Sequence, residues 1–170
     1  MAVMSAGILL YRITGRERMS RGDVPPFEVL IAHMGGPYWA KKAEGAWTIP
    51  KGEFDAHAES ALDAARREFA EELGVEAPGV PYAELGTFAY SSGKRVVVFV
   101  ADGTGFAAEA FRYGTFELEW PPRSGRTAEF PEVDDARWTD AATASSLLVR
   151  GQRPALEALA RHLGEVSGEG

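Results

Sequence analysis

Short segments in which apolar residues run together or alternate with polar ones predict most of the secondary structure. Residues 4–13 and 27–34 form a predicted hairpin, because the charged stretch between them ends in Pro25-Pro26 and is typical of a turn connection. Ser91-Ser92-Gly93 is a second hairpin signal. The strands predicted in this way are 4–13, 27–34, 82–90, 94–101 and 135–138, with a short extended piece at 47–50.

Helical spacing occurs first in the middle of the chain. Over residues 60–73 the apolar positions recur at intervals of three and four, and Gly74 stands where a left-handed helix cap is expected. Two further helices are predicted at 139–148 and 154–163, and residues 103–126 are expected to form a long irregular loop. Strands, one central helix, more strands and final helices, in that order, predict an α/β or α+β sandwich.

Composition limits the possible classes of protein. The chain has 170 residues, 45% hydrophobic and 25% charged, so we expect a single domain over residues 1–165 and a flexible tail over 166–170. Cysteine is absent, which excludes a disulfide framework, a thiolate metal site and a cysteine nucleophile. No apolar stretch reaches the roughly 18 residues that a bilayer requires, and no signal peptide is recognisable. We therefore expect a cytoplasmic protein without a membrane partner.

The formal net charge of −7 argues against long nucleic acids as partners, because these require a basic surface. A small polyphosphate is compatible with an acidic protein if divalent cations and a few basic side chains neutralise its charge. Lys41, Lys42 and Lys51 lie within eleven residues of each other, just before the central helix. They are candidates for that role, and the alternative is that they are solvated loop lysines.

The predicted central helix carries three glutamates on one face. Glu68, Glu71 and Glu72 are spaced by three and four residues. Such carboxylates repel each other, which a protein tolerates on a solvated face or uses to hold a hard cation through oxygen ligands. Arg67 is placed to brace the preceding loop, most simply by pairing with Glu53. The alternative is an ordinary amphipathic surface helix.

The stretch from Gly52 to Val75 resembles the signature of the Nudix hydrolases. That pattern is glycine, five residues, glutamate, seven residues, then Arg-Glu, an apolar residue, any residue, Glu-Glu, any residue, glycine and an apolar residue. Here Glu59 is followed after seven residues by Arg67-Glu68-Phe69-Ala70-Glu71-Glu72-Leu73-Gly74-Val75. The loop departs from the pattern, since six residues separate Gly52 from Glu59. Similarity to a bacterial Nudix subfamily of predicted NTP pyrophosphohydrolases extends to residues 35–42, 45–53, 92–94, 116–122 and 130–134.

The resemblance implies a mixed β-sheet between helices and a metal-dependent active site. It implies Mg²⁺ or Mn²⁺ bound by Glu68, Glu71 and Glu72, with the Gly52 carbonyl and a carboxylate from outside the motif. We assign that last role to Glu132, with Glu129 as the rival. The general base varies within the family, so three candidates stay open: Glu68, Glu71 and Glu132. Arg67 completes the predicted catalytic set.

Substrate contacts are expected from lysines and aromatic residues. Lys51 and Lys94 are the predicted phosphate ligands, and Lys42 is a further candidate. An aromatic residue near the position of Tyr90 often stacks on a base in related dinucleoside polyphosphate hydrolases; the alternative is a tyrosine that packs on the sheet. Three more aromatic residues could line a base pocket, namely Tyr38, Trp39 and Trp120. Trp47 is expected in the core, and the three histidines show no metal-ligand spacing.

The leading hypothesis is a pyrophosphohydrolase of small nucleotides. Within it, dinucleoside polyphosphates such as diadenosine tetraphosphate are slightly favoured over nucleoside triphosphates, and ADP-ribose-type conjugates are a further possibility. The alternative class is a non-catalytic nucleotide sensor with the same fold, although such domains usually lose the motif carboxylates. Monomer and homodimer both stay open.

Overall fold

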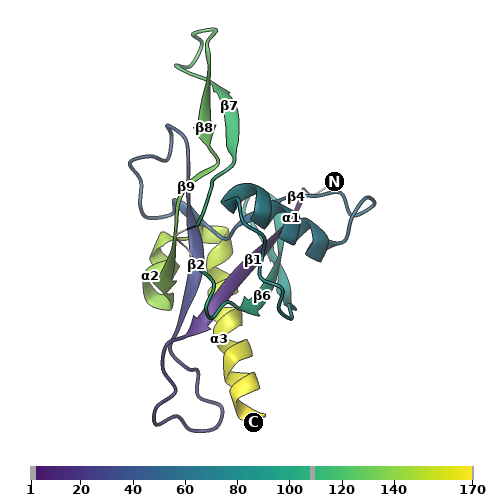
Figure 1. Ribbon diagram of the computed structural model, residues 1–170, viewed down its shortest axis with the longest axis vertical. Helices are drawn as coiled ribbons and strands as arrows, with labels where there is room; N and C mark the ends of the chain where they lie inside the picture. The colour runs from purple at the N-terminus through teal and green to yellow at the C-terminus, as the bar shows by residue number, and fades with distance from the viewer. Residues whose placement is uncertain (1–2, 108–109, 170) are drawn as a thin grey trace.

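The computed structural model describes residues 3–107 and 110–169 and has a mixed seven-stranded sheet at its centre (Figure 1). The main strand path is β3-β2-β1-β6-β5, while β4 also pairs with β1 and β9 with β2. β1 and β6 run parallel, and the other pairs of this sheet are antiparallel. The strands are β1 (Met4–Ile13), β2 (Phe27–Met34), β3 (Trp47–Thr48), β4 (Lys51–Glu53), β5 (Ala83–Ala89), β6 (Arg95–Asp102) and β9 (Val133–Asp140).

Helices cover both faces of the sheet, which confirms the predicted sandwich. Alternate residues of β1 point to opposite faces: Ile8 and Leu10 belong to the core beneath helix α1 (Ala61–Leu73), whereas Leu9 belongs to the core beneath the C-terminal helices. On that second face lie α2 (Ala141–Leu147), the 3₁₀ turn η1 (Arg150–Gln152) and α3 (Arg153–Gly168).

Helix α1 begins and ends where its sequence predicts. The hydroxyl group of Ser60 accepts a hydrogen bond from the amide of Asp63 at 3.1 Å and caps the first turn. Gly74 adopts the left-handed conformation with φ of 71° and ends the helix, and its amide donates to the Ala70 carbonyl. A side chain at Gly74 would also collide with the Arg112 carbonyl. The register of the acidic face is therefore fixed at both ends.

The expected irregular loop over 103–126 is wrong in its second half. Strand β7 (Thr115–Glu119) pairs with β8 (Thr127–Pro131) in a separate hairpin that projects from the body of the molecule (Figure 1). The physical reason is the period of two from Phe116 to Trp120, in which apolar residues alternate with acids. Residues 108–109 of the expected loop lie outside the described residues.

The predicted tail is helical over most of its length. Helix α3 continues to Gly168, and Arg21 from the β1–β2 connection donates a hydrogen bond to the Gly168 carbonyl. Gly170, the last residue of the predicted tail, lies outside the described part of the chain. Within the described part, no helix has the length and apolar character needed to cross a membrane.

Candidate active site

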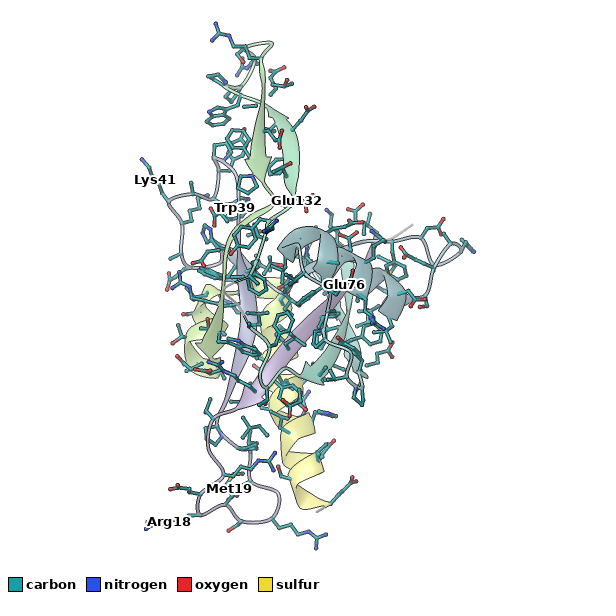
Figure 2. The ribbon with its side chains drawn as sticks, in the orientation of Figure 1. Arg18, Met19, Trp39, Lys41, Glu76 and Glu132 are labelled. Carbon is teal, nitrogen blue, oxygen red and sulfur yellow. The ribbon has the colours of Figure 1, made fainter. Side chains whose placement is uncertain are left out.

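A cleft of about 360 Å³ opens at the foot of the β7–β8 hairpin, where α1, β4 and the start of β9 meet. Figure 2 shows Trp39 and Glu132 at this foot. The cleft brings together three of the four carboxylates predicted for the site. Its lining residues are Met34, Gly35, Trp39, Thr48, Lys51, Gly52, Glu68, Glu72, Phe116, Glu132 and Val133.

The glutamates of α1 differ in how far they face the cleft. The Glu68 side chain is 13% exposed and lines the cleft, whereas that of Glu71 is 55% exposed and is not among the lining residues. The opposite side of the helix buries Phe69 and Leu73 completely against the sheet. The helix therefore presents Glu68 and Glu72 to the cleft and leaves Glu71 at its edge.

Glu72 is the most perturbed carboxylate of the cleft. Its pKa is raised to about 8, mainly by burial and to a lesser extent by the charges of Glu132 and Glu68, against the lowering effect of Lys51. The backbone amide of Lys51 donates a hydrogen bond to Glu72 Oε2 at 3.2 Å. A cation bound here would have to displace the Glu72 proton, and its charge would offset the repulsion between the neighbouring carboxylates.

Gly52 is glycine because Glu68 lies directly against it. A β-carbon at residue 52 would be 1.9 Å from Glu68 Cδ and 2.0 Å from its Oε2. Residue 52 belongs to β4 and pairs with Ala6 of β1, so its backbone is held by the sheet. The absence of a side chain thus allows the Glu68 carboxylate to pack against the backbone of the loop strand.

Arg67 braces the loop against the helix, but through Glu59 and not through the Glu53 side chain, so the predicted partner is wrong. Its guanidinium contacts the Glu59 carboxylate at 2.5 Å and Glu68 at 2.7 Å, and reaches only the backbone carbonyl of Glu53, at 3.5 Å. Hydrogen bonds to Glu59 and then to Glu68 raise the pKa of Arg67 above its ordinary value. The Glu53 side chain instead faces Lys94 at 3.8 Å.

The extra residue of the loop lies in an exposed turn. The amides of Ala58 and Glu59 both donate to the Asp55 carbonyl, and the His57 amide donates to the Asp55 side chain. Residues 55–58 are exposed, whereas Glu59 turns back to Arg67. The turn therefore absorbs the additional residue before the helix starts.

Glu132 lines the cleft from the junction between β8 and β9. Partial burial raises its pKa, with further contributions from the charges of Glu68 and Glu71. Its rival Glu129 is exposed on β8, pairs across the hairpin with Glu117 and does not line the cleft. The structure therefore brings Glu132 to Glu68 and Glu72 and keeps Glu129 apart from them.

The predicted lysines are divided between different surfaces. Lys51 lines the cleft. Lys42 is exposed on the 35–46 loop, with its ammonium group 5.1 Å from the centre of the Trp39 ring. Lys94 is exposed in the β5–β6 turn and faces Glu53 outside the cleft. Of the three, only Lys51 lies with the carboxylates in the described structure.

Tyr90 does not line the cleft. Its ring packs against Gly151, where a β-carbon would be 2.3 Å from the ring, and its hydroxyl oxygen accepts a hydrogen bond from Gln152 at 2.7 Å. This is the packing alternative considered for this tyrosine. The aromatic residues that do line the cleft are Trp39 and Phe116; Trp120 lies farther out on the hairpin and meets Tyr38 edge to face. Trp47 is buried, as predicted.

His33 joins the two segments that flank the cleft. Its Nδ1 is 2.6 Å from Asp134 Oδ1, and its Nε2 is 2.6 Å from the Lys42 carbonyl. Both of these partners carry acceptor oxygens, and which ring nitrogen donates depends on the tautomer of the imidazole. The sequence gives no sign of this role, because the partners lie 101 and 9 residues away along the chain. The ring ties the loop that carries Trp39 to the segment that carries Glu132.

A family model described as the NUDIX domain matches residues 20–160. The chain belongs to the NUDIX family. It is a Nudix hydrolase, as the motif from Gly52 to Val75 predicts, and the site just described contains that motif. No curated protein matches the sequence.

Solved structures show the same fold at low sequence identity. An Ap4A hydrolase from C. elegans, solved as a binary complex, is 20% identical, with a TM-score of 0.58 over 95% of this chain and 98% of that one. The NUDIX domain of Shewanella oneidensis NrtR, solved with ADP-ribose, is 15% identical, with a TM-score of 0.59 over 96% and 89%. A MutT protein from Methanosarcina mazei Go1 is 18% identical, with a TM-score of 0.56 over 95% and 94%.

Nudix hydrolases generally use divalent metal ions, and the donor set of this cleft suits one. Glutamate oxygens are the ligands that Mg²⁺ prefers, and ionising Glu72 beside Glu68 and Glu132 requires compensating positive charge. Among the described residues, no three acidic, histidine or cysteine side chains are already gathered at metal-binding distance. Glu68 is held by Arg67, and Glu72 by the Lys51 amide. The cleft thus offers suitable oxygen donors, and a bound ion would draw them together.

Proposed function

We propose that this Nudix hydrolase cleaves a diphosphate linkage in a nucleoside polyphosphate and that it uses Mg²⁺ or Mn²⁺. The observation that carries the proposal is the convergence of Glu68, Glu72 and Glu132 on one cleft that also contains Lys51 and two aromatic residues. Oxygen ligands suit the ion, an ammonium group suits phosphate, and a flat aromatic side chain suits a base.

Glu68 and Glu72 are the proposed principal metal ligands, with the Gly52 carbonyl and Glu71 at the edge of the same set. When bound, the ion neutralises phosphate charge and lowers the pKa of water. Arg67 holds Glu68 in place, and Lys51 binds a non-bridging phosphate oxygen. Trp39 and Phe116 provide the apolar walls for a base and exclude water from that part of the cleft.

Glu132 is the proposed carboxylate from outside the motif. In the described part of the chain its side chain has no hydrogen-bond partner, unlike Glu68 and Glu72, so it is available to accept a proton from water or to complete the metal site. Glu132→Gln should lower kcat by about 100-fold. Glu129→Gln is the matched control, since it makes the same change three residues earlier, on β8 and outside the cleft, and it should change kcat less than twofold. Equal effects of the two variants would contradict the assignment.

Within this class we retain dinucleoside polyphosphates as the favoured substrates over nucleoside triphosphates. Tyr90 no longer supports that preference, because its ring packs on Gly151. The support comes instead from the aromatic surface of the hairpin beside the cleft, where Trp120 and Tyr38 meet.

The test is turnover of a substrate panel with product identification. The panel contains diadenosine tetraphosphate, ATP and ADP-ribose, each with Mg²⁺, with Mn²⁺ and with chelator. We expect metal-dependent cleavage of at least one nucleoside polyphosphate, and none with chelator. Cleavage of ADP-ribose alone would move the substrate class to nucleoside diphosphate conjugates. Binding of a nucleotide without turnover of any compound would indicate the non-catalytic sensor instead.

A further inference from the structure

Four aromatic side chains form a continuous series along one side of the β7–β8 hairpin. Ring centroids are 6.2 Å apart for Phe116 and Phe130, 6.4 Å for Phe130 and Trp120, and 5.4 Å for Trp120 and Tyr38. None of the four belongs to either hydrophobic core that holds the sheet and helices together. Their presence is therefore not explained by the stability of the sandwich.

The hairpin has one apolar face and one acidic face. Phe116 pairs with Phe130, and Leu118 with Ala128, whereas Glu117 pairs with Glu129 on the other face. The 35–46 loop lies on the apolar side, where a β-carbon at Gly36 would be 3.1 Å from the Phe116 ring. Figure 1 shows this loop beside the projecting hairpin. Loop and hairpin together thus carry the aromatic series.

The series starts in the cleft and ends in solvent. Phe116 lines the cleft that contains the three carboxylates, and Tyr38 at the other end of the series is 55% exposed. Trp39, the neighbour of Tyr38, also lines the cleft. A ligand bound at the carboxylates can therefore extend along this side without leaving the aromatic surface.

The geometry at the outer end suits a flat aromatic ligand. The planes of Tyr38 and Trp120 meet at 85°, so the two rings form a corner in which a base can lie flat on one ring and touch the other with its edge. Stacking of this kind accepts any base, because each has a π-face. An exposed tyrosine and a half-buried tryptophan outside both cores are typical of a recognition surface.

We propose that Tyr38 and Trp120 form a second base-binding site, which stacks on the distal base of a dinucleoside polyphosphate whose phosphates lie at Glu68, Glu72 and Glu132. The inference rests on the proposed function, because it requires nucleotide phosphates in the cleft. It assigns the hairpin a role in substrate choice: a substrate with two bases gains a contact that a nucleoside triphosphate lacks.

Trp120→Ala and Tyr38→Ala test the site through KM. With diadenosine tetraphosphate as substrate, each variant should raise KM by about tenfold and leave kcat within twofold. With ATP, KM and kcat should both stay within twofold. Trp120→Phe keeps an aromatic face, so it should retain most of the affinity for diadenosine tetraphosphate that Trp120→Ala loses. Glu117→Ala, on the acidic face of the same hairpin, is the matched control. It should leave KM and kcat unchanged for both substrates.

Leu118→Ala separates recognition from folding of the hairpin. It removes an apolar side chain from the same face without removing a ring of the series. It should therefore leave the KM for diadenosine tetraphosphate within twofold, even if it lowers the melting temperature.

Three results would overturn the second base site: an equal rise in KM for both substrates, a rise with Leu118→Ala as large as with Trp120→Ala, or no rise with any of the aromatic variants. If one of these results is found but the protein still cleaves ATP in a metal-dependent reaction, the second base site is wrong and the proposed function stands. Absence of any nucleotide turnover in the unmodified protein would overturn the proposed function itself.

Discussion

The guanidinium of Arg67 forms two parallel hydrogen bonds to the carboxylate of Glu59, with Nε 3.2 Å from Oε2 and Nη2 2.5 Å from Oε1. A third nitrogen, Nη1, lies 2.7 Å from Glu68 Oε1. One side chain therefore connects the end of the loop to a carboxylate of the cleft. Because a fork of two bonds fixes orientation as well as distance, Arg67 determines how Glu68 is presented.

Arg67→Lys should separate this orienting role from charge. Lysine keeps the positive charge but cannot bond both oxygens of Glu59 and reach Glu68, so we expect kcat/KM to fall by about 10–100-fold. Urea unfolding should show a loss of at most about 1 kcal/mol, because the Arg67 side chain is 39% exposed and solvent screens the ion pairs. Arg66→Lys makes the same change one residue earlier, on an exposed arginine, and should leave kcat/KM unchanged. Full activity in Arg67→Lys would show that Glu68 needs no such support.

Gly52→Ala should displace Glu68 from its position. The added methyl group would lie 1.9 Å from Glu68 Cδ, and the carboxylate, as the end of a flexible side chain, must move by more than 1 Å. We expect kcat to fall by about 100-fold with little loss of stability. Gly79→Ala is the control, since a β-carbon there would meet nothing within 4 Å. Steady-state kinetics and a melting curve measure both effects, and unchanged kcat in Gly52→Ala would contradict the role given to Glu68.

The acidic helix could be predicted from sequence because its information is local. Ser60 and Gly74 fix the ends of the helix, and the spacing of Glu68 and Glu72 then determines that they share a face. The need for glycine at residue 52 could not be predicted in the same way. It arises because the carboxylate of Glu68, sixteen residues later, packs against strand β4 at that position. The extra loop residue could not be placed either, since it is absorbed by a turn at Asp55 that the motif does not specify.

Substrate contacts were harder to predict because they depend on distant partners. Tyr90, just after β5, could face either surface of the sheet, and the absence of a side chain at Gly151 leaves the space that receives its ring. Lys94 faces Glu53 across segments 41 residues apart. The β7–β8 hairpin, in contrast, has a visible alternation from Phe116 to Trp120, so its strand could have been predicted from the period of two.

Stability of the metal-free protein should depend on pH through Glu72. Its pKa rises from an ordinary 4.5 to about 8 in the folded state, so the unfolded chain releases this proton first. The stability that the protonated carboxyl contributes is complete below about pH 4.5 and is lost as the pH rises through about 8. At pH 9, Glu72→Gln should therefore be more stable than the unmodified protein, by on the order of 3 kcal/mol.

Urea unfolding with chelator at pH 5 and pH 9 measures this effect. The difference between Glu72→Gln and the unmodified protein should be small at pH 5 and large at pH 9. Glu76→Gln, an exposed glutamate just after the same helix, controls for the general effect of removing a negative charge. A difference that is the same at both pH values would show that the Glu72 carboxyl ionises normally in the folded protein.

His33→Ala should loosen the cleft without changing its carboxylates. The substitution removes the bonds to Asp134 and to the Lys42 carbonyl, and with them the connection between the Trp39 loop and the Glu132 segment. We expect a loss of about 2–3 kcal/mol in urea unfolding and a rise in KM that exceeds the change in kcat. His57→Ala, in the exposed turn after β4, is the control. An unchanged KM in a folded His33→Ala protein would show that the connection does not shape the cleft.

The central claim is that Glu72 acts through a divalent cation, and kcat of Glu72→Gln at saturating Mg²⁺ tests it most directly. The matched comparison is Glu76→Gln, and a circular dichroism spectrum confirms that both variants are folded. The account predicts that Glu72→Gln lowers kcat by on the order of 1000-fold on the nucleoside polyphosphate that the unmodified protein cleaves, while Glu76→Gln stays within twofold. Turnover by folded Glu72→Gln at the unmodified rate would contradict it.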